Sequence, residues 1–233
     1  GWNPREFAMF GTQLVEKGYE QAAEWIRVIE QAYGSDEPFD FNGAYYTLKN
    51  AISRPASVQV PRPVTMNAAF GSPGRDFAAG HCDYLFTTFS EIEGSEKHVE
   101  DITARADKVG RPVGVYTVCH VVCRETQQEA DDYYERYAVT IADSVAVDIH
   151  MAGKKEFSQS HDAAAYDRYR KRFAGGAGSY PLVGTPEKIV EEMLAISAKG
   201  YSGIALSFVN YTHELAYFCD RVLPLMRKAG LRN

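Results

Sequence analysis

The sequence predicts an α/β fold in which parallel strands are covered by helices. From residue 64 onward, short apolar runs alternate with longer stretches whose apolar residues recur at helical spacing, which is typical of such a sheet. Apolar residues make up 45% of the 233 residues and charged residues 24%, as in globular proteins, and no run is apolar enough to span a membrane. We therefore expect a single folded domain over residues 1–233 that does not enter a membrane.

The segment before this alternation predicts a helix and a hairpin. Apolar residues recur at helical spacing from Tyr19 to Tyr33, which indicates an amphipathic helix. Two aromatic-rich runs between Phe39 and Leu48 flank Asn42-Gly43, a dipeptide that favours a two-residue hairpin turn. A proline-rich, extended stretch follows from Arg54 to Pro63.

Four parallel strands are expected in the remainder. They fall at residues 64–69, 84–89, 114–122 and 203–208. The expected helices are one that ends near residue 81, one that begins after residue 125, and three at residues 95–109, 186–199 and 214–228. A closed barrel of eight strands takes about 250 residues, so four strands indicate either a small open sheet or half a barrel. Residues 126–180 form an insertion longer than a crossover needs, and its run from Ala174 to Gly178 predicts a flexible lid.

The turn after the first of these strands has the composition of a phosphate-binding loop. Gly71, Ser72 and Gly74 lie where a strand passes into a helix, and the backbone N–H groups of a helix N-terminus attract phosphate. Ser72 adds a hydroxyl donor. Glycine, serine and proline also occur in such turns for conformational reasons alone, so the pattern by itself leaves both interpretations open.

Polar residues near the carboxyl ends of two later strands are candidates for chemistry. The two-residue period places His120 on the opposite face from Cys119 and Cys123, which argues against a metal site shared by these residues. His120 is then either an active-site imidazole or a buried histidine bonded to a carbonyl. Asn210 and Tyr211 follow the last strand and either line the same mouth or plug it.

Charge and cysteine content exclude some classes of protein. Lys and Arg total 25 against 31 Asp and Glu, a net charge of −6, and no basic run suggests a nucleic-acid partner. The four cysteines are too few and too scattered for a disulfide scaffold, which favours a reducing, cytoplasmic location.

Several segments are shared, in order and in spacing, with one protein family. They are Gly1 to Phe7, Tyr19 to Trp25, Phe41 to Tyr46, Asn67 to Ser72, Cys82-Asp83, His120 to Thr126 and Leu182 to Glu187. Over essentially its whole length the chain resembles the bacterial-luciferase-like, FMN-dependent monooxygenases, in the branch of the alkanesulfonate, dimethyl sulfone and pyrimidine enzymes. The resemblance implies a (β/α)8 TIM barrel of which this chain supplies strands five to eight, so we expect it to be part of a longer protein.

The resemblance also implies roles for residues of the N-terminal part. Asn67, Gly71 and Ser72 would bind the flavin, with Gly71 and Ser72 holding its phosphate. Glu6 matches a position that contacts the flavin in the pyrimidine branch, and Tyr19 matches the tyrosine of a flavin-proximal element whose arginine is missing here.

For the substrate side, the resemblance makes His120 a catalytic residue that orients the reacting groups. Asn210 and Tyr211 would shape the pocket. The arginine that the sulfonate branch carries two residues before the histidine is Val118 here. Because a buried sulfonate without a cation is costly, we expect a neutral substrate such as a sulfone or a heterocycle.

The implied activity is that of the oxygenase component of a two-component system. It would use reduced FMN, delivered by a separate NAD(P)H:FMN reductase, together with O2, to oxidise a small neutral organosulfur compound such as dimethyl sulfone. A cytoplasmic homo-oligomer, a dimer or a tetramer, is expected, without a metal. The alternatives are a pyrimidine-type heterocycle monooxygenase, a non-catalytic flavin-binding or assembly subunit, and a deazaflavin-dependent reductase.

Overall fold

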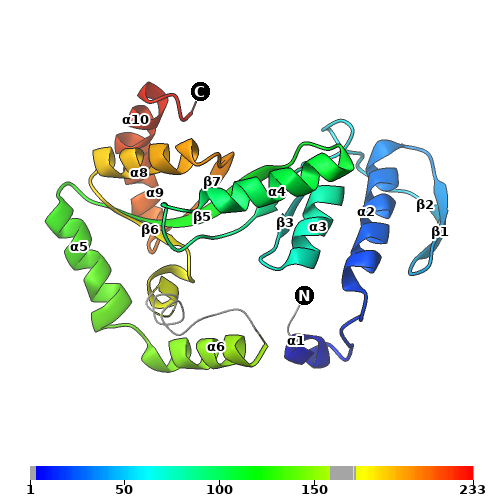
Figure 1. The fold of residues 1–233 in the computed structure, drawn as a ribbon, viewed down its shortest axis with the longest axis horizontal. Helices are drawn as coiled ribbons and strands as arrows, with labels where there is room; N and C mark the ends of the chain where they lie inside the picture. Colours follow the sequence, from blue (N-terminus) through cyan, green and yellow to red (C-terminus); the bar gives the residue numbers. More distant parts are fainter. Residues whose placement is uncertain (1–3, 158–169, 171, 233) are drawn as a thin grey trace. The chain divides into compact units, whose positions relative to one another are not determined.

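The computed structural model describes residues 4–157, 170 and 172–232. The chain divides into two compact units (Figure 1). The first contains residues up to Leu85 together with Ile102–Val113, and the second contains Phe86–Asp101 and the chain from Gly114 onward. Helix α4, Glu96–Val109, therefore contributes its first residues to the second unit and the rest to the first.

Two helices and a hairpin begin the first unit. After α1, Pro4–Met9, helix α2 spans Gly18–Gly34, as its periodicity predicts. The hairpin consists of β1, Phe39–Asn42, and β2, Thr47–Ala51, in antiparallel pairing.

The predicted hairpin is present, but the prediction that Asn42-Gly43 forms a tight two-residue turn is wrong. Asn42 pairs with Thr47, so the loop contains the four residues between them. The carboxylate of Glu24, on α2, accepts hydrogen bonds from the backbone N–H groups of Ala44, Tyr45 and Tyr46 at 2.7–2.9 Å. Burial raises the pKa of Glu24, but these N–H groups outweigh it and leave the pKa lowered. A carboxylate on another element therefore determines the loop.

The core of the first unit lies between a short pair of strands and their helices. Strand β3, Met66–Ala68, is followed by α3, Ser72–His81, and then by β4, Tyr84–Phe86, which lies beside β3 in the sheet. Both strands are shorter than expected. Ala78, Leu85 and Ile102 are almost completely buried.

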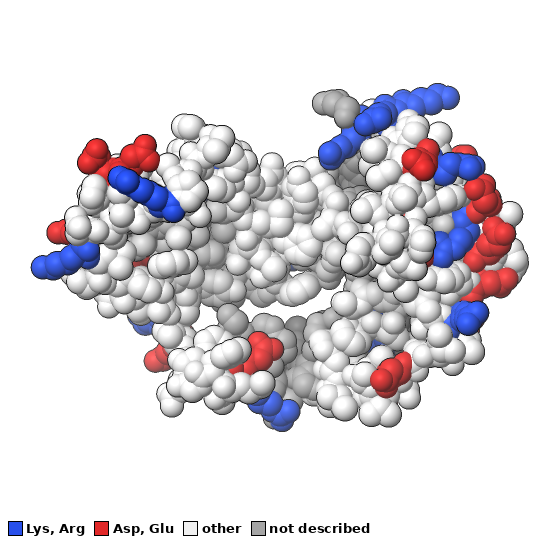
Figure 2. Space-filling model, turned by 180° about the vertical axis from the view of Figure 1, so that it is seen from behind, with Lys and Arg blue, Asp and Glu red and all other residues white. Residues whose placement is uncertain are grey.

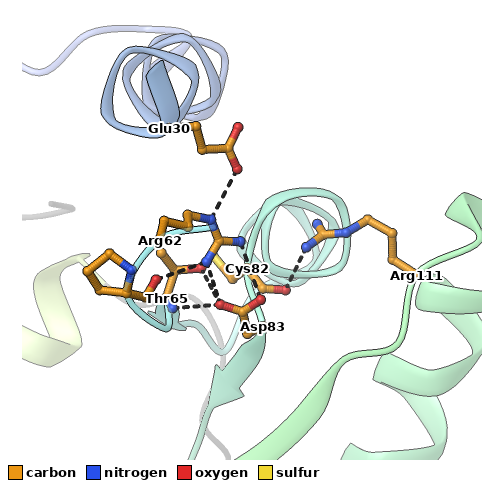
Figure 3. Close-up of polar contacts among 7 residues, drawn as sticks. Glu30, Arg62, Thr65, Cys82, Asp83 and Arg111 are labelled. Atoms are coloured by element: carbon orange, nitrogen blue, oxygen red, sulfur yellow. Dashed lines mark hydrogen bonds and ion pairs between the residues drawn. The ribbon is translucent and has the colours of Figure 1, made fainter. Parts of the chain in front are cut away.

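An ion-pair cluster joins the proline-rich stretch to this core (Figure 3). Nη1 of Arg62 lies 2.6 Å from Oδ2 of Asp83, and its Nε lies 3.2 Å from Oε1 of Glu30 on α2. The same carboxyl oxygen of Asp83 accepts hydrogen bonds from the backbone N–H and the hydroxyl of Thr65. The hydrogen bonds and charge of Arg62 lower the pKa of Asp83 most; burial raises it, but together with the hydrogen bonds from Thr65 the arginine leaves the pKa lowered from 3.8 to about 2. These polar residues stabilise the fold.

The second unit is built around β5, Gly114–Cys123, with a parallel strand on each side. Strand β7, Gly203–Ser207, pairs with Tyr116 to His120, as expected for the last strand. Strand β6, Tyr180–Gly184, pairs with Cys119 to Cys123. It is not one of the four parallel strands that the sequence predicts. Its five residues include a proline and a glycine and show no alternation, so the sequence carries little signal for it.

Helices cover this sheet and form the insertion (Figure 1). Helix α8, Pro186–Ala198, packs on β5 and β6, and Thr185 caps its N-terminus as Pro186 predicts. The expected helix at 214–228 is divided into α9, Tyr211–Arg221, and α10, Leu223–Lys228, because Pro224 interrupts the hydrogen-bond ladder. No helix in the described parts of the chain is long and apolar enough to cross a bilayer.

The insertion contains α5, Gln127–Glu135, a π-helical turn at Arg136–Thr140 and α6, Ser144–Phe157. The run from Ala174 to Gly178 is the end of a helix followed by a turn, and its role as a lid remains a prediction. Residues 172–176 are helical, and the N–H groups of Ala177 and Gly178 bond back to Phe173 and Arg172. Ala177 and Gly178 have positive φ, so glycine here serves a helix C-terminus.

Candidate functional site

The N-terminus of α3 has the geometry of a phosphate cradle. Gly71 is the N-cap residue and has no side chain with which to cap the first backbone N–H groups of the helix. A Cβ added at Gly71 would meet only Cδ of Pro73, at 3.9 Å, so the space beside the helix end is open. The positive end of the helix dipole and these N–H groups favour an anion there.

Tyr19 and Asn67, both predicted to be near the flavin, lie at this turn. A Cβ at Gly74 would lie 2.4 Å from the hydroxyl of Tyr19 and 2.6 Å from Cβ of Ala69, so only glycine permits these contacts. Nδ2 of Asn67 donates a hydrogen bond to the carbonyl of Gly74 at 3.0 Å. Asn67 therefore holds the shape of the turn, while Tyr19 approaches it from α2.

Sequence reasoning missed Arg105, which brings a positive charge to the same place. From α4, its Nη1 donates hydrogen bonds to Oγ of Ser72 at 2.9 Å and to Oδ1 of Asp76 at 2.5 Å. The Arg105 side chain is 21% exposed and the Asp76 side chain 64%. A carboxylate thus holds the guanidinium beside the Ser72 hydroxyl, within reach of the helix N-terminus.

These residues fit the phosphate of FMN. A phosphate needs several hydrogen-bond donors and positive charge, and the turn offers backbone N–H groups, the hydroxyl of Ser72 and the guanidinium of Arg105. Glu6 lies at an exposed position of α1, and its contact with flavin remains a prediction.

His120 lies in a separate polar cluster in the second unit. It is 2% exposed, and its Nδ1 lies 3.1 Å from Oγ of Ser179. The ring of Tyr134, on α5, is 5.6 Å away, centroid to centroid. Burial and the charge of Arg172 lower the pKa of His120 to about 4, although the Ser179 backbone raises it slightly, so the imidazole is neutral at neutral pH.

Arg172, which sequence reasoning also missed, supplies that charge. Its Nη1 and Nη2 donate hydrogen bonds to the backbone carbonyls of Phe89, at 2.8 Å, and Ser90. Its guanidinium lies 5.2 Å from the ring centre of Tyr180 and 3.9 Å from Glu91. Although residue 118 is a valine and not an arginine, the charge of Arg172 therefore still acts on His120. The guanidinium of Arg172 is already bonded to two backbone carbonyls and lies near a carboxylate.

An open pocket of about 540 Å³ lies at the carboxyl end of β5. Asn210 lines it, together with Arg124, which follows β5, Tyr133 of α5 and Glu214 of α9. Arg124 lies 2.7 Å from Glu214, and its guanidinium lies 4.0 Å from the ring centre of Tyr133. Two charged groups of the pocket, Arg124 and Glu214, thus bond to one another.

The structure does not bring the three predicted catalytic residues together. His120 is not among the residues that line this pocket. Tyr211, at the start of α9, is 72% exposed and does not line it. The roles of Asn210 and Tyr211 in shaping a substrate site remain predictions.

Burial disfavours the thiolate form of the cysteines on β5. All four are free thiols, and burial raises the pKa of Cys119 to about 12 and that of Cys123 to about 11. On the face seen in Figure 2, acidic side chains gather along the right edge and a small group of basic side chains lies above them.

Comparison with known proteins places these features in a family. The model of the luciferase-like monooxygenases matches residues 1–203. An "FMNH(2)-dependent dimethylsulfone monooxygenase" of Pseudomonas putida is 27% identical over 98% of this chain and 64% of its own length. "Pyrimidine monooxygenase RutA" of Allorhizobium ampelinum is 23% identical, over 97% of this chain and 64% of its own length.

Solved structures have the same α/β fold. DmoA from Hyphomicrobium sulfonivorans superimposes with a TM-score of 0.81 at 18% identity, covering 97% of this chain and 60% of that one. The long-chain alkane monooxygenase LadA gives 0.78 at 20% identity, covering 95% and 59%. The chain spans 64% of the length of the curated relatives it matches. It belongs to the luciferase-like monooxygenase family.

Proposed function

We propose that the protein is the oxygenase component of a two-component monooxygenase that uses reduced FMN and O2. The observation that carries this proposal is the uncapped N-terminus of α3, where Ser72 and Arg105 add a hydroxyl and a cation to the helix dipole. Family membership and the names of the FMNH2-dependent relatives support it. A separate NAD(P)H:FMN reductase would deliver the flavin.

In this proposal the chain's own residues bind and orient. Backbone N–H groups of α3, Ser72 and Arg105 would hold the phosphate, while Asn67 keeps the turn in shape and Tyr19 lies beside it. Reduced FMN, when bound, supplies the electrons with which O2 is activated.

The substrate side would be formed by His120 and its neighbours. A neutral, buried imidazole can exchange hydrogen bonds with an uncharged substrate without a charge penalty. We propose a small neutral substrate, with dimethyl sulfone and a pyrimidine-type heterocycle as the candidates that the relatives suggest. Because Arg172 is already engaged by carbonyls, an alkanesulfonate is not expected to be preferred.

Three further features belong to this proposal. Four of the sheet's strands, β3, β4, β5 and β7, would be strands five to eight of a (β/α)8 barrel, with β6 added by the insertion. Residues 126–180 would exclude water from the reacting groups, and the enzyme would be a homo-oligomer. Ser179 and the backbone at Gly176 lie against His120, so the end of this helix contacts the imidazole directly.

The experiment is a reconstituted assay with the full-length protein, a flavin reductase, NADH and FMN. We expect reduced FMN to bind and one of the candidate substrates to be oxygenated with O2 consumption coupled to product. His120→Ala should lower turnover and leave flavin binding nearly unchanged. Flavin binding without coupled product from either substrate would instead indicate a non-catalytic subunit, and preferential binding of a deazaflavin would indicate a reductase.

A further inference from the structure

The hydroxyl of Ser179 lies between His120 and a backbone carbonyl. Oγ of Ser179 is 3.1 Å from Nδ1 of His120 and donates a hydrogen bond to the carbonyl oxygen of Gly176. A carbonyl oxygen only accepts, so the single hydroxyl hydrogen of Ser179 is directed to Gly176. The hydroxyl then faces the imidazole with a lone pair, and Nδ1 of His120 must carry the hydrogen of the bond between them.

The other ring nitrogen is left as a buried acceptor. Nε2 of His120 is inaccessible to solvent and has no hydrogen-bond partner among the described residues. In a neutral imidazole whose hydrogen is on Nδ1, Nε2 has a lone pair and no hydrogen. Buried polar atoms in folded proteins are almost always satisfied, so an acceptor in this position indicates a donor that is not part of the described chain.

The imidazole of His120 is closely packed on both sides of its contact with Ser179. A Cβ on Gly176 would lie 2.2 Å from Nδ1 of His120, which means that the backbone at this glycine lies directly against the ring. Tyr134 packs beside the imidazole with ring centres 5.6 Å apart. In this packing, the contact with Oγ of Ser179 identifies the ring edge that carries Nδ1.

We propose that Ser179 is a positioning residue that fixes the Nδ1–H tautomer of His120, so that Nε2 accepts a hydrogen bond from an N–H or O–H group of the substrate. The substrate half of this inference rests on the proposed function. The polar atoms of a sulfone are oxygens that only accept hydrogen bonds, so a sulfone could not donate one to the acceptor Nε2. A cyclic amide or imide presents ring N–H groups and would satisfy Nε2. The geometry thus favours an N–H-bearing heterocycle over dimethyl sulfone.

The tautomer is tested directly by NMR of the full-length protein with isotopically labelled histidine nitrogens. We expect the His120 resonances of a protonated Nδ1 and an unprotonated Nε2. Ser179→Ala should weaken this preference, Ser179→Thr should restore it, and the exposed control Ser197→Ala should leave it unchanged. A wild-type protein whose Nε2 carries the hydrogen would overturn the inference, as would an unchanged tautomer in a folded Ser179→Ala variant.

The ligand is tested on the same resonances with three probes at saturating concentration: uracil, its N,N′-dimethylated analogue and dimethyl sulfone. Uracil alone should shift the Nε2 resonance, because it alone offers N–H groups. No shift with uracil, or an equal shift with dimethyl sulfone, would refute the substrate assignment. A parallel FMN titration separates the two proposals, since loss of FMN binding contradicts the proposed function whether or not Nε2 responds.

Discussion

Arg105→Gln is expected to weaken FMN binding while leaving riboflavin binding unchanged. The guanidinium of Arg105 lies 2.9 Å from Oγ of Ser72, at the helix end where we place the phosphate. Riboflavin lacks the phosphate, so it does not use this cation. The difference between the two ligands therefore isolates the contribution of Arg105 to phosphate binding.

The magnitude follows from what Arg105 gains and gives up. A hydrogen bond to a charged group contributes about 1.5–3 kcal/mol. To reach the phosphate, Arg105 leaves Asp76, whose side chain is 64% exposed. An exposed pair of this kind is worth about 0.2–1 kcal/mol. The net loss in Arg105→Gln should be about 1–2 kcal/mol, or roughly 5–30-fold in Kd.

The assay is a fluorescence titration of the full-length protein with each flavin. Lys108→Gln is the matched control, because Lys108 lies on the same helix, is exposed and loses the same charge. Asp76→Asn removes the competing carboxylate and should tighten FMN binding by up to about 5-fold. Equal effects of Arg105→Gln on FMN and riboflavin, or an equal effect of Lys108→Gln, would show that Arg105 does not contact the phosphate.

Three further variants test individual contacts, two in the first unit and one in the second. Asp83→Asn should flatten the acid limb of the urea-denaturation stability curve: the lowered pKa makes Asp83 stabilising above its ordinary value of 3.8, and this contribution is lost as pH falls towards about 2. An equally steep limb in the variant would contradict this. Gly176→Ala places a Cβ 2.2 Å from Nδ1 of His120 and should lower the free energy of unfolding by about 1–3 kcal/mol, whereas the control Gly80→Ala, with open space inside α3, should raise it. Glu24→Gln should speed hydrogen exchange at the three loop amides that its carboxylate binds, most clearly above its lowered pKa, and unchanged exchange would disprove that role.

Local patterns in the sequence were sufficient to predict most helices and four of the parallel strands. Helix α2 and strand β5 have clear apolar periodicity, and each was located to within a residue or two. Strand β6 was missed because five residues with a proline and a glycine look like a connection, and only its pairing with β5 makes it a strand. The division between α9 and α10 had a visible signal in Pro224.

Where a local rule failed, a distant residue was responsible. Asn42-Gly43 favours a two-residue turn, but the carboxylate of Glu24 binds three backbone N–H groups and stabilises a longer loop. The glycine run at 174–178 has the composition of a mobile segment. Its positive φ values instead complete the end of a helix that packs on His120.

The candidate sites show the same division between what is local and what is not. Ser72 and His120 could be selected from the sequence because each lies near the carboxyl end of a strand, where α/β folds place their chemistry. Their chemical states could not, because each is set by a partner from a distant part of the chain: Arg105 for Ser72, and Ser179 for His120. Truncating Ser72 or His120 removes the hydroxyl or the imidazole itself, so such a variant cannot report on the nearby charge or on the tautomer. Changing the partner alters the charge or the tautomer and leaves the group in place, so variants of Arg105 and Ser179 discriminate a binding role from a structural one more sharply.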